Sequence, residues 1–318
     1  MNDLNLIRDP ARKLGFVALA LLMLLPVMTA PVGLAAGLAF ALLFGNPFKD
    51  ITPGLAGLML KTCVVGLGFG LPIAMVVSTG LTGLWVTGLG VMTILALGVG
   101  LGKLLRIEAD TLTLISAGTA ICGGSAIAAA APAIKARVEA VSVSLACVFA
   151  LNAVALIIFP TIGKALGLSQ SQFAIWAAIA IHDTSSVVGA AATYGDEALQ
   201  QATILKLARA LWIVPLVVVL AWTPHFRRGH ARAAAAWPWF IALFVVAAVL
   251  RSLLPGWQNQ FDGLAAIARQ LLVPTLYLVG SGLGWPVLRA IGLRPLLMAL
   301  LLWLFVSVVV LGIVLAVV

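Results

Sequence analysis

The sequence predicts an all-helical protein that crosses a membrane many times, and two observations lead to this fold class. Of its 318 residues, 63% are hydrophobic and only 9% are charged, whereas soluble domains carry about 25% charged residues. The apolar residues also gather in long runs without sustained period-two alternation, which argues against a β-barrel. No soluble core could absorb this composition, so the lipid bilayer is the expected solvent.

Eleven apolar segments follow one another along the chain. They cover residues 14–29, 31–46, 54–77, 82–102, 111–135, 140–162, 171–193, 203–222, 237–254, 264–288 and 295–318. A helical span needs about 20 residues. The first two segments are short, and we expect a tight hairpin broken by Pro26 and Pro31. The others are long enough to span, which predicts nine to eleven transmembrane helices in a single domain, 1–318.

The basic residues between these segments predict the topology. With a cytoplasmic N-terminus and eleven spans, twelve Lys and Arg side chains lie inside and four outside, in agreement with the positive-inside rule. If segments 111–135 and 171–193 re-enter instead, the counts become thirteen and three. Charge alone therefore leaves both topologies open.

An internal repeat is visible near the two ends of the chain. Val65–Pro72 (VGLGFGLP) matches Val279–Pro286 (VGSGLGWP) at five of eight positions. The two copies cross in opposite directions, which indicates an inverted repeat of about 31–102 and 237–318, as in secondary transporters. A weaker echo pairs Ile121–Ser125 with Ile181–Ser185. The alternative is coincidence in a chain rich in Gly, Ala and Val.

The stretch GTAICGGSAIAAAAP (118–132) holds the first group of candidate site residues. Gly123 and Gly124 each weaken a helix by about 1 kcal/mol relative to Ala. A break there would leave backbone groups unpaired, which lipid does not tolerate unless they face protein or water. A helix restarting at Ser125 would offer its N-terminus to an anion. The alternative is close helix packing through small residues.

The second group is His182-Asp183-Thr184-Ser185-Ser186. Asp183 is the only acidic residue deep inside an apolar segment, and charge buried in a membrane is costly enough to mark functional sites. An unperturbed histidine titrates near neutral pH, so His182 and Asp183 are candidates for proton or ion coupling. The alternative is that the two side chains merely satisfy each other or a neighbouring helix.

Two basic residues, Lys206 and Arg209, follow Asp183 in the next apolar segment, and Lys61 lies in an earlier one. Lys206 and Arg209 are spaced i,i+3 and share a helix face. Because Asp183 needs a cationic partner, we expect one of the three to pair with it. Together with His182 they outnumber this carboxylate, which favours an anionic substrate. Lys206 and Arg209 lie near the start of segment 203–222, so snorkelling to the interface is the alternative.

Other classes of function find little support. There is no Walker A sequence, no HExxH and no metal-spaced cluster of Cys and His, so ATP-driven pumping, a metal and a cofactor are not expected. The net charge of +9 resides mostly in short gaps between segments, which fits topology rather than nucleic-acid binding. Cys63, Cys122 and Cys147 all lie in apolar segments, so no disulfide framework is expected.

Four stretches carry a resemblance to a known family. They are ICGGSAIAAAAPAIKA (121–136), AIHDTSSVVGAA (180–191), KLARALWIVP (206–215) and PGLAGLMLKTCVVGLGFGL (53–71). The chain resembles the YeiH-like family of uncharacterised bacterial inner-membrane proteins proposed to export sulfate. The resemblance implies inverted repeats and unwound helices, as in the cation/proton antiporter and anion transporter superfamily. The family has Glu-Val-Ala-Gln where this chain has Asp183–Ser186, which puts the substrate in doubt.

These features together predict a secondary active transporter of a small anion, sulfate or a related sulfur oxyanion first, working by alternating access. The expected substrate-binding residues are Gly123, Gly124, Ser125, His182, Ser185, Ser186, Lys206 and Arg209, with His182 and Asp183 for coupling to protons or sodium. A cation/proton antiporter using Asp183, a passive channel, and an intramembrane hydrolase using Ser185 or Cys122 with His182 are the alternatives. Homo-oligomerisation is left open, and no enzyme activity is expected.

Overall fold

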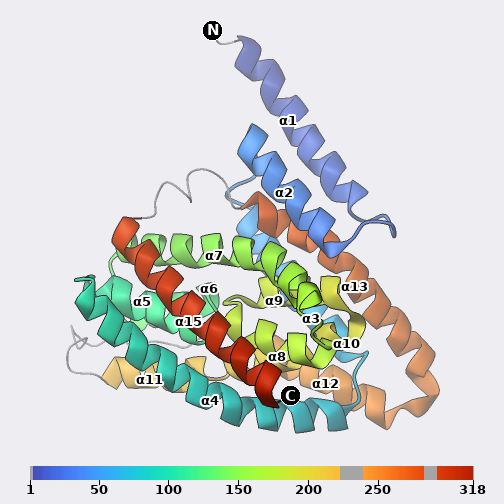
Figure 1. The fold of residues 1–318 in the computed structure, drawn as a ribbon. Coiled ribbons are helices and arrows are strands. Elements are labelled where there is room, and N and C mark those ends of the chain that lie inside the picture. The colour runs from blue at the N-terminus through green and yellow to red at the C-terminus, as the bar shows by residue number, and fades with distance from the viewer. Residues whose placement is uncertain (1–2, 223–238, 283–291, 318) are drawn as a thin grey trace. The chain divides into compact units, whose positions relative to one another are not determined.

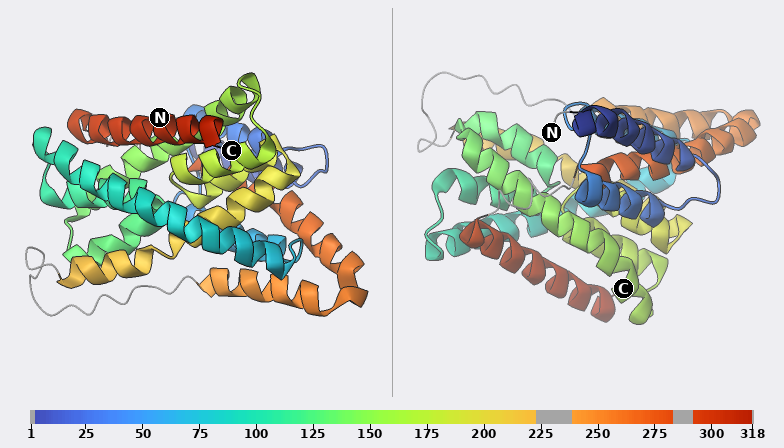
Figure 2. Two further views of the ribbon diagram at one scale, coloured as in Figure 1. Left: turned by 60° about the horizontal axis from the view of Figure 1, so that its bottom comes forward. Right: turned by 90° about the horizontal axis from the view of Figure 1, so that it is seen from above.

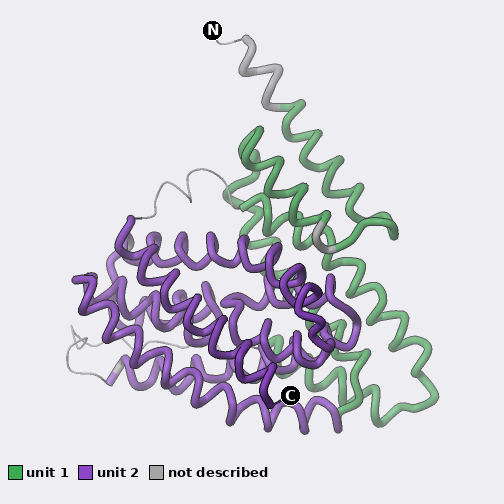
Figure 3. Tube along the Cα trace, in the orientation of Figure 1, with its two compact units in different colours: residues 1–73, 239–288 green, residues 74–238, 289–318 purple. Residues whose placement is uncertain are grey.

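The computed structural model describes residues 3–222, 239–282 and 292–317, and these residues form helices without a strand (Figure 1). This confirms the all-helical prediction. The chain divides into two compact units, coloured separately in Figure 3. Unit 1 comprises residues 1–73 and 239–288, and unit 2 comprises residues 74–238 and 289–318.

The helices follow one another with short connections. They are α1 (Asp3–Leu22), α2 (Ala30–Phe44), α3 (Thr52–Gly68), α4 (Ile73–Leu104), α5 (Ala109–Ala120), α6 (Gly124–Ile134), α7 (Val138–Ala165), α8 (Gln170–Ala180), α9 (Thr184–Tyr194), α10 (Asp196–Ala210), α11 (Ile213–Trp222), α12 (Trp239–Leu253), the 3-10 helix η2 (Pro255–Trp257), α13 (Gln258–Ser281) and α15 (Leu293–Val317). Among the described residues, five helical stretches are long and apolar enough to cross a membrane, and they are Ile73–Leu104, Glu139–Ala165, Asp196–Leu220, Pro255–Ser281 and Leu293–Val317. The protein is therefore a multi-pass membrane protein.

Unit 1 is built around α13, which packs against α2 and α3, while α12 packs against α3. The approach of α2 to α13 depends on glycine. A Cβ atom on Gly33 would clash with the carbonyl oxygen of Val273, and one on Gly37 with that of Tyr277. Small residues let helix backbones come this close in membranes. The break predicted at Pro26 and Pro31 is confirmed, since α1 ends at Leu22 and α2 begins at Ala30.

The two copies of the longer repeat end their helices at nearly the same place. Helix α3 ends at Gly68, which aligns with Gly282, and α13 ends one position earlier, at Ser281. The last part of the second copy lies outside the described residues. Unit 1 contains α2 and α3 from one half and α12 and α13 from the other, and unit 2 contains both α4 and α15. The inverted repeat and the single domain stay predictions. The division into units nevertheless places corresponding helices of the two halves in the same unit.

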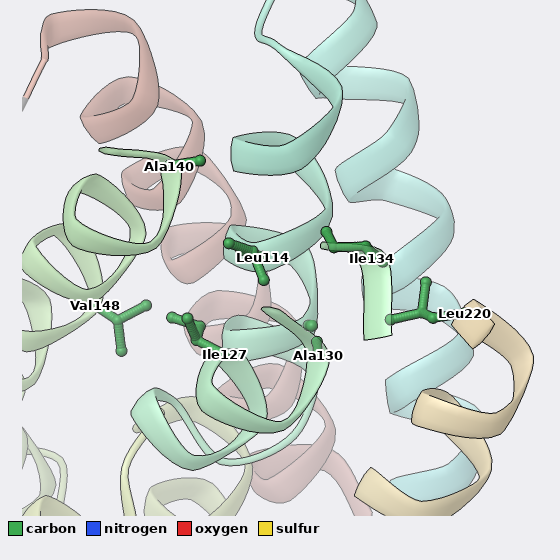
Figure 4. Close-up of a cluster of buried hydrophobic side chains, with 8 residues drawn as sticks. Leu114, Ile127, Ala130, Ile134, Ala140, Val148 and Leu220 are labelled. Atoms are coloured by element: carbon green, nitrogen blue, oxygen red, sulfur yellow. The ribbon is translucent and has the colours of Figure 1, made fainter. Parts of the chain in front are cut away.

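In unit 2, α5 and α6 form a helical hairpin, hereafter hairpin 1. The backbone N–H of Arg137, just beyond α6, donates to Asp110 Oδ2 in the first turn of α5 at 3.2 Å. The Arg137 guanidinium also pairs with Glu108. Figure 4 shows Leu114 of α5 beside the inner face of α6, in the cluster of buried apolar residues that joins both helices to α7 and α11. The segment thus returns to the side from which it started.

Helices α8 and α9 form a second hairpin, hereafter hairpin 2. The hydroxyl of Tyr194, at the end of α9, donates to the carbonyl oxygen of Leu168, just before α8, at 2.6 Å. The Tyr194 ring stacks on Phe173 with the centroids 3.8 Å apart. Both interrupted segments therefore fold back on themselves, as the second of the two topologies left open by the charges requires.

Helix α7 joins the two hairpins and shows that they start at opposite ends of it. It has 28 residues and so runs about 42 Å, from the base of hairpin 1 to the base of hairpin 2 (Figures 1 and 2). A Cβ atom on Gly123 of hairpin 1 would lie 3.2 Å from Val148. Asn152, at the middle of α7, bonds to Asp183 of hairpin 2. The two tips meet beside the middle of α7.

Candidate functional site

The tips of the hairpins are two equivalent breaks in helical structure. Helix α5 ends at Ala120 and α6 begins at Gly124, while α8 ends at Ala180 and α9 begins at Thr184. Each break has three residues, and the weaker sequence echo aligns them in this register. Gly123 has φ +61° and ψ −125°, a conformation that residues other than glycine rarely adopt. A Cβ atom there would lie 3.3 Å from both Cβ and N of Asp183, so the tips touch.

Lys206 of α10 binds both tips through backbone carbonyl groups. Its Nζ donates to the carbonyl oxygens of Ile121 at 3.2 Å, Ala178 at 3.3 Å and Ile181 at 2.8 Å. The side chain is fully buried. An ammonium group has three donors, so all of them are engaged. Lys206 cannot donate to a substrate without giving up one of these bonds.

Arg209, one turn further along α10, completes the same arrangement. Its Nε donates to Ala120 O at 2.7 Å and its Nη2 to Thr119 O at 2.8 Å, while Nη1 donates to the carbonyl oxygens of Ala178 and Ile179. These acceptors belong to the C-terminal ends of α5 and α8, where helices leave carbonyl groups unpaired and the dipole is negative. Lys206 and Arg209 therefore stabilise two helix ends deep in the protein.

The position of these two cations corrects one sequence interpretation. Helix α10 begins at Asp196 rather than near residue 203, so Lys206 and Arg209 lie in the middle of the Asp196–Leu220 stretch. With exposed fractions of 0% and 1%, they do not snorkel to an interface. The acidic pair Asp196 and Glu197 in the first turn was the sequence signal for the earlier start, because acidic residues favour helix N-termini.

The expected pairing of Asp183 with a cation is wrong. Among the described residues, no Lys or Arg forms an ion pair with Asp183, and Lys61 lies on α3 of unit 1. Instead Asp183 caps α9, since its Oδ2 accepts the backbone N–H of Ser185 at 3.1 Å and also the Ser185 hydroxyl. A carboxylate is a favourable N-cap because it offsets the positive end of the helix dipole.

The predicted site residues of the two tips differ in exposure. Ser185 and Ser186, in the first turn of α9, are 3% and 5% exposed. Gly124 is half-buried, and Ser125 is exposed. The N-cap residue of α6 is Gly123, which has no side chain to cap the helix. The two helix N-termini are adjacent, one capped by a carboxylate and the other not.

Three buried polar side chains around the tips have unused hydrogen-bonding atoms. Among the described residues, both ring nitrogens of His182, Nδ2 of Asn152 and Oγ1 of Thr119 have no hydrogen-bond partner. The exposed fractions are 1%, 4% and 2%, respectively. Buried polar groups nearly always form hydrogen bonds, so these atoms are candidates for binding a ligand.

Sequence reasoning missed Asn152. Its Oδ1 accepts the backbone N–H of Asp183 at 3.2 Å, which fixes the second break against α7. The signal was present, since an amide in the middle of an apolar segment is rare enough in membranes to suggest a role.

The architecture defines a class: a multi-pass helical membrane protein whose two re-entrant hairpins start from opposite ends of one long helix and meet at their tips. The family model described as conserved hypothetical protein 698 matches residues 17–299. The chain belongs to this family, whose members include the UPF0324 membrane proteins, and the YeiH-like resemblance is confirmed.

Relatives match along nearly the whole chain. A UPF0324 membrane protein of Geobacter sulfurreducens is 44% identical over 307 residues, covering 96% of each chain. One from Bdellovibrio bacteriovorus is 44% identical over 303 residues, covering 94% of this chain and 93% of its own. One from Porphyromonas gingivalis is 46% identical over 284 residues, covering 88% of this chain and 85% of its own. No solved structure matches.

Proposed function

We propose that this protein is a secondary active transporter of a small anion, with sulfate or a related sulfur oxyanion as the first candidate substrate. It would work by alternating access in a bacterial inner membrane, with a cytoplasmic N-terminus. The observation that carries the proposal is the meeting of two helix N-termini, those of α6 and α9, at touching tips in the middle of α7. Helix N-termini bind anions through free N–H groups and their dipoles.

The charge at the tips supports an anion. Four helix ends meet there, two positive and two negative, so their partial charges roughly cancel. Of the described residues, Lys206 and Arg209 direct two basic side chains at the tips, and Asp183 contributes one carboxyl group. The basic groups outnumber the acidic one. The unused donors of Asn152 and Thr119 could supply hydrogen bonds to oxyanion oxygens.

Asp183 gives the transporter a way to couple anion movement to protons. Its carboxylate already occupies the N-terminus of α9 and accepts the donors of Ser185. A substrate anion would compete for the same positive helix end, and two anions there would repel each other. Protonation of Asp183 would relieve this repulsion, so substrate and proton would bind together. His182, with two unused ring nitrogens, is the neighbouring group through which a proton could pass.

The test is sulfate transport in proteoliposomes that contain purified protein. We would compare the wild type with Asp183→Asn and with Asp50→Asn, a control at an exposed carboxylate. Asparagine is as good an N-cap as aspartate, so α9 should keep its start. We expect saturable sulfate counterflow in all three proteins. Uptake driven by a proton gradient should be lost only in Asp183→Asn.

A cation/proton antiporter is the second candidate, because Asp183 is only half-buried and forms no ion pair with a described cation. It would show cation-dependent proton flux that Asp183→Asn abolishes. Absence of counterflow with sulfate, sulfite and a small sulfonate, from folded protein, would remove the anion proposal and favour this one. Non-saturable flux without counterflow would instead indicate a channel.

The hydrolase alternative receives less support from the tip geometry. It needs the Ser185 hydroxyl or the Cys122 thiol to be hydrogen-bonded to His182 as a general base. In the structure the Ser185 hydroxyl donates to Asp183 instead. Among the described residues, neither ring nitrogen of His182 has a partner. We therefore propose transport without a catalytic step.

A further inference from the structure

A second polar site lies far from the tips, at the base of hairpin 1. Three helices begin there, α5 at Ala109, α7 at Val138 and α15 at Leu293. The first turns of all three, with the residues that follow α4, line one cavity of about 260 Å³. This is several times the roughly 30 Å³ that one water molecule occupies in the liquid. The cavity lies at the N-terminal end of α7, one of the helices long and apolar enough to cross a membrane.

The charges of this cavity favour an anion. Arg106, Arg137 and Arg294 line it together with Glu108 and Glu139, which leaves one positive charge in excess. Three helix N-termini add the positive ends of their dipoles, offset in part by acidic residues in the first turns of α5 and α7. The N-cap side chains of α5 and α7 make no capping hydrogen bond.

Two of the three arginines are available to a ligand. Arg137 is engaged with Glu108. The side chains of Arg106 and Arg294 are exposed and, among the described residues, form no ion pair or hydrogen bond. Guanidinium groups match the geometry of phosphate oxygens, which they can bind in a bidentate manner. A phosphate group is therefore the ligand chemistry that the cavity suits best.

The surface beside the cavity indicates where this phosphate comes from. Along α15, starting next to Arg294, one face presents exposed leucines, namely Leu293 (82%), Leu297 (39%), Leu301 (40%) and Leu304 (44%). The spacing i, i+4, i+8 and i+11 keeps them on one side of the helix. This leucine stripe continues along the same face in exposed apolar side chains, as at Val308 (66%) and Leu315 (53%). The face can therefore lie against an acyl chain, which a soluble phosphate does not have.

We propose that this cavity binds the phosphate headgroup of an anionic membrane phospholipid, with an acyl chain lying along the leucine stripe of α15. The bound headgroup would bridge Arg106 beyond α4 and Arg294 of α15 across the start of hairpin 1. The lipid would thereby brace the base on which the tip of hairpin 1 depends. This site is independent of the transported substrate.

The experiment measures lipid binding and thermal unfolding of delipidated protein in detergent. The probes are phosphatidylglycerol, phosphatidylcholine and inorganic phosphate. The variant is Arg106→Gln with Arg294→Gln, and the control is Lys103→Gln with Lys164→Gln, which removes two exposed cations that do not line the cavity. All four side chains are exposed, so both double variants should fold.

We expect phosphatidylglycerol to bind the wild type and the control and to raise their unfolding temperatures, with phosphatidylcholine having little effect. The arginine variant should bind phosphatidylglycerol at least about tenfold more weakly, since hydrogen bonds to charged groups are the strong ones. Equal effects of the two lipids, or an arginine variant that binds like the wild type, would overturn the proposal. If inorganic phosphate alone stabilises as well as the lipid, the site takes a soluble anion instead.

Discussion

Replacing Lys206 with methionine separates its structural role from a role in binding substrate. Methionine keeps the length of the side chain but donates no hydrogen bond. Ala178 O would retain Arg209 as a donor, whereas Ile121 O and Ile181 O would lose Lys206, their side-chain donor. A buried carbonyl left unpaired costs about 1–3 kcal/mol. We therefore expect Lys206→Met to lose about 2–6 kcal/mol, reduced by the desolvation of the charge that is no longer buried.

The assay is thermal unfolding of the purified protein, followed by gel-filtration recovery after heating, with Lys164→Met as the control at an exposed lysine. We expect a clearly lower unfolding temperature for Lys206→Met and little change for the control. A residue that only binds the substrate would behave differently, because its replacement would raise the KM for the anion and leave the stability unchanged. That second pattern would refute the assignment of Lys206 to the two helix ends.

Two further predictions concern the hairpins. Gly123→Ala should cost about 1–3 kcal/mol because of the positive φ of this residue, and it should impair transport. Gly124→Ala is the matched control, because Gly124 does not have a positive φ and its added Cβ would meet side chains only, Phe149 at 3.1 Å and Leu145 at 3.5 Å. Equal stability of the two variants would contradict the assignment of backbone strain to Gly123. Single cysteines at Ala109 and Glu139 should react with an impermeant thiol reagent from one side of the membrane, and a cysteine at Lys164 from the other. Labelling of Ala109 and Glu139 from opposite sides would show that hairpin 1 spans.

Much of the fold could be predicted because lipid imposes its rules directly on composition. Apolar runs indicated helices, and prolines and glycines marked where helices stop, as at Pro26 and Gly123. Whether hairpin 1 and hairpin 2 span or re-enter could not be read from the sequence. That choice depends on contacts between residues distant in the sequence, such as Arg137 with Asp110 and Tyr194 with Leu168.

The sequence predicted most of the residues at the candidate site, but it did not predict what each of them binds. A lone carboxylate near two cations suggests ion pairing, since opposite charges attract. Broken helices change this expectation because each break creates a negative end that needs a cation and a positive end that needs an anion. Lys206 and Arg209 satisfy the first requirement and Asp183 the second. The sequence shows the charges, but the helix ends that bind them exist only in the folded protein.

The difference between the two tips suggests different roles under the proposed function, with substrate binding at the start of α6 and proton binding at the start of α9. Both breaks have the same length and the same register, yet one has Gly123 at its N-cap and the other has Asp183. A glycine leaves the positive end of α6 without an internal anion, so that end is free to attract a substrate. A carboxylate on α9 neutralises its own helix until it takes up a proton. Because the tips touch, the charge on Asp183 acts directly on an anion at α6. Replacing Gly123 with aspartate would put a carboxylate at both helix ends. The KM for sulfate counterflow should therefore rise further than in Gly123→Ala, which shares the backbone strain but adds no charge.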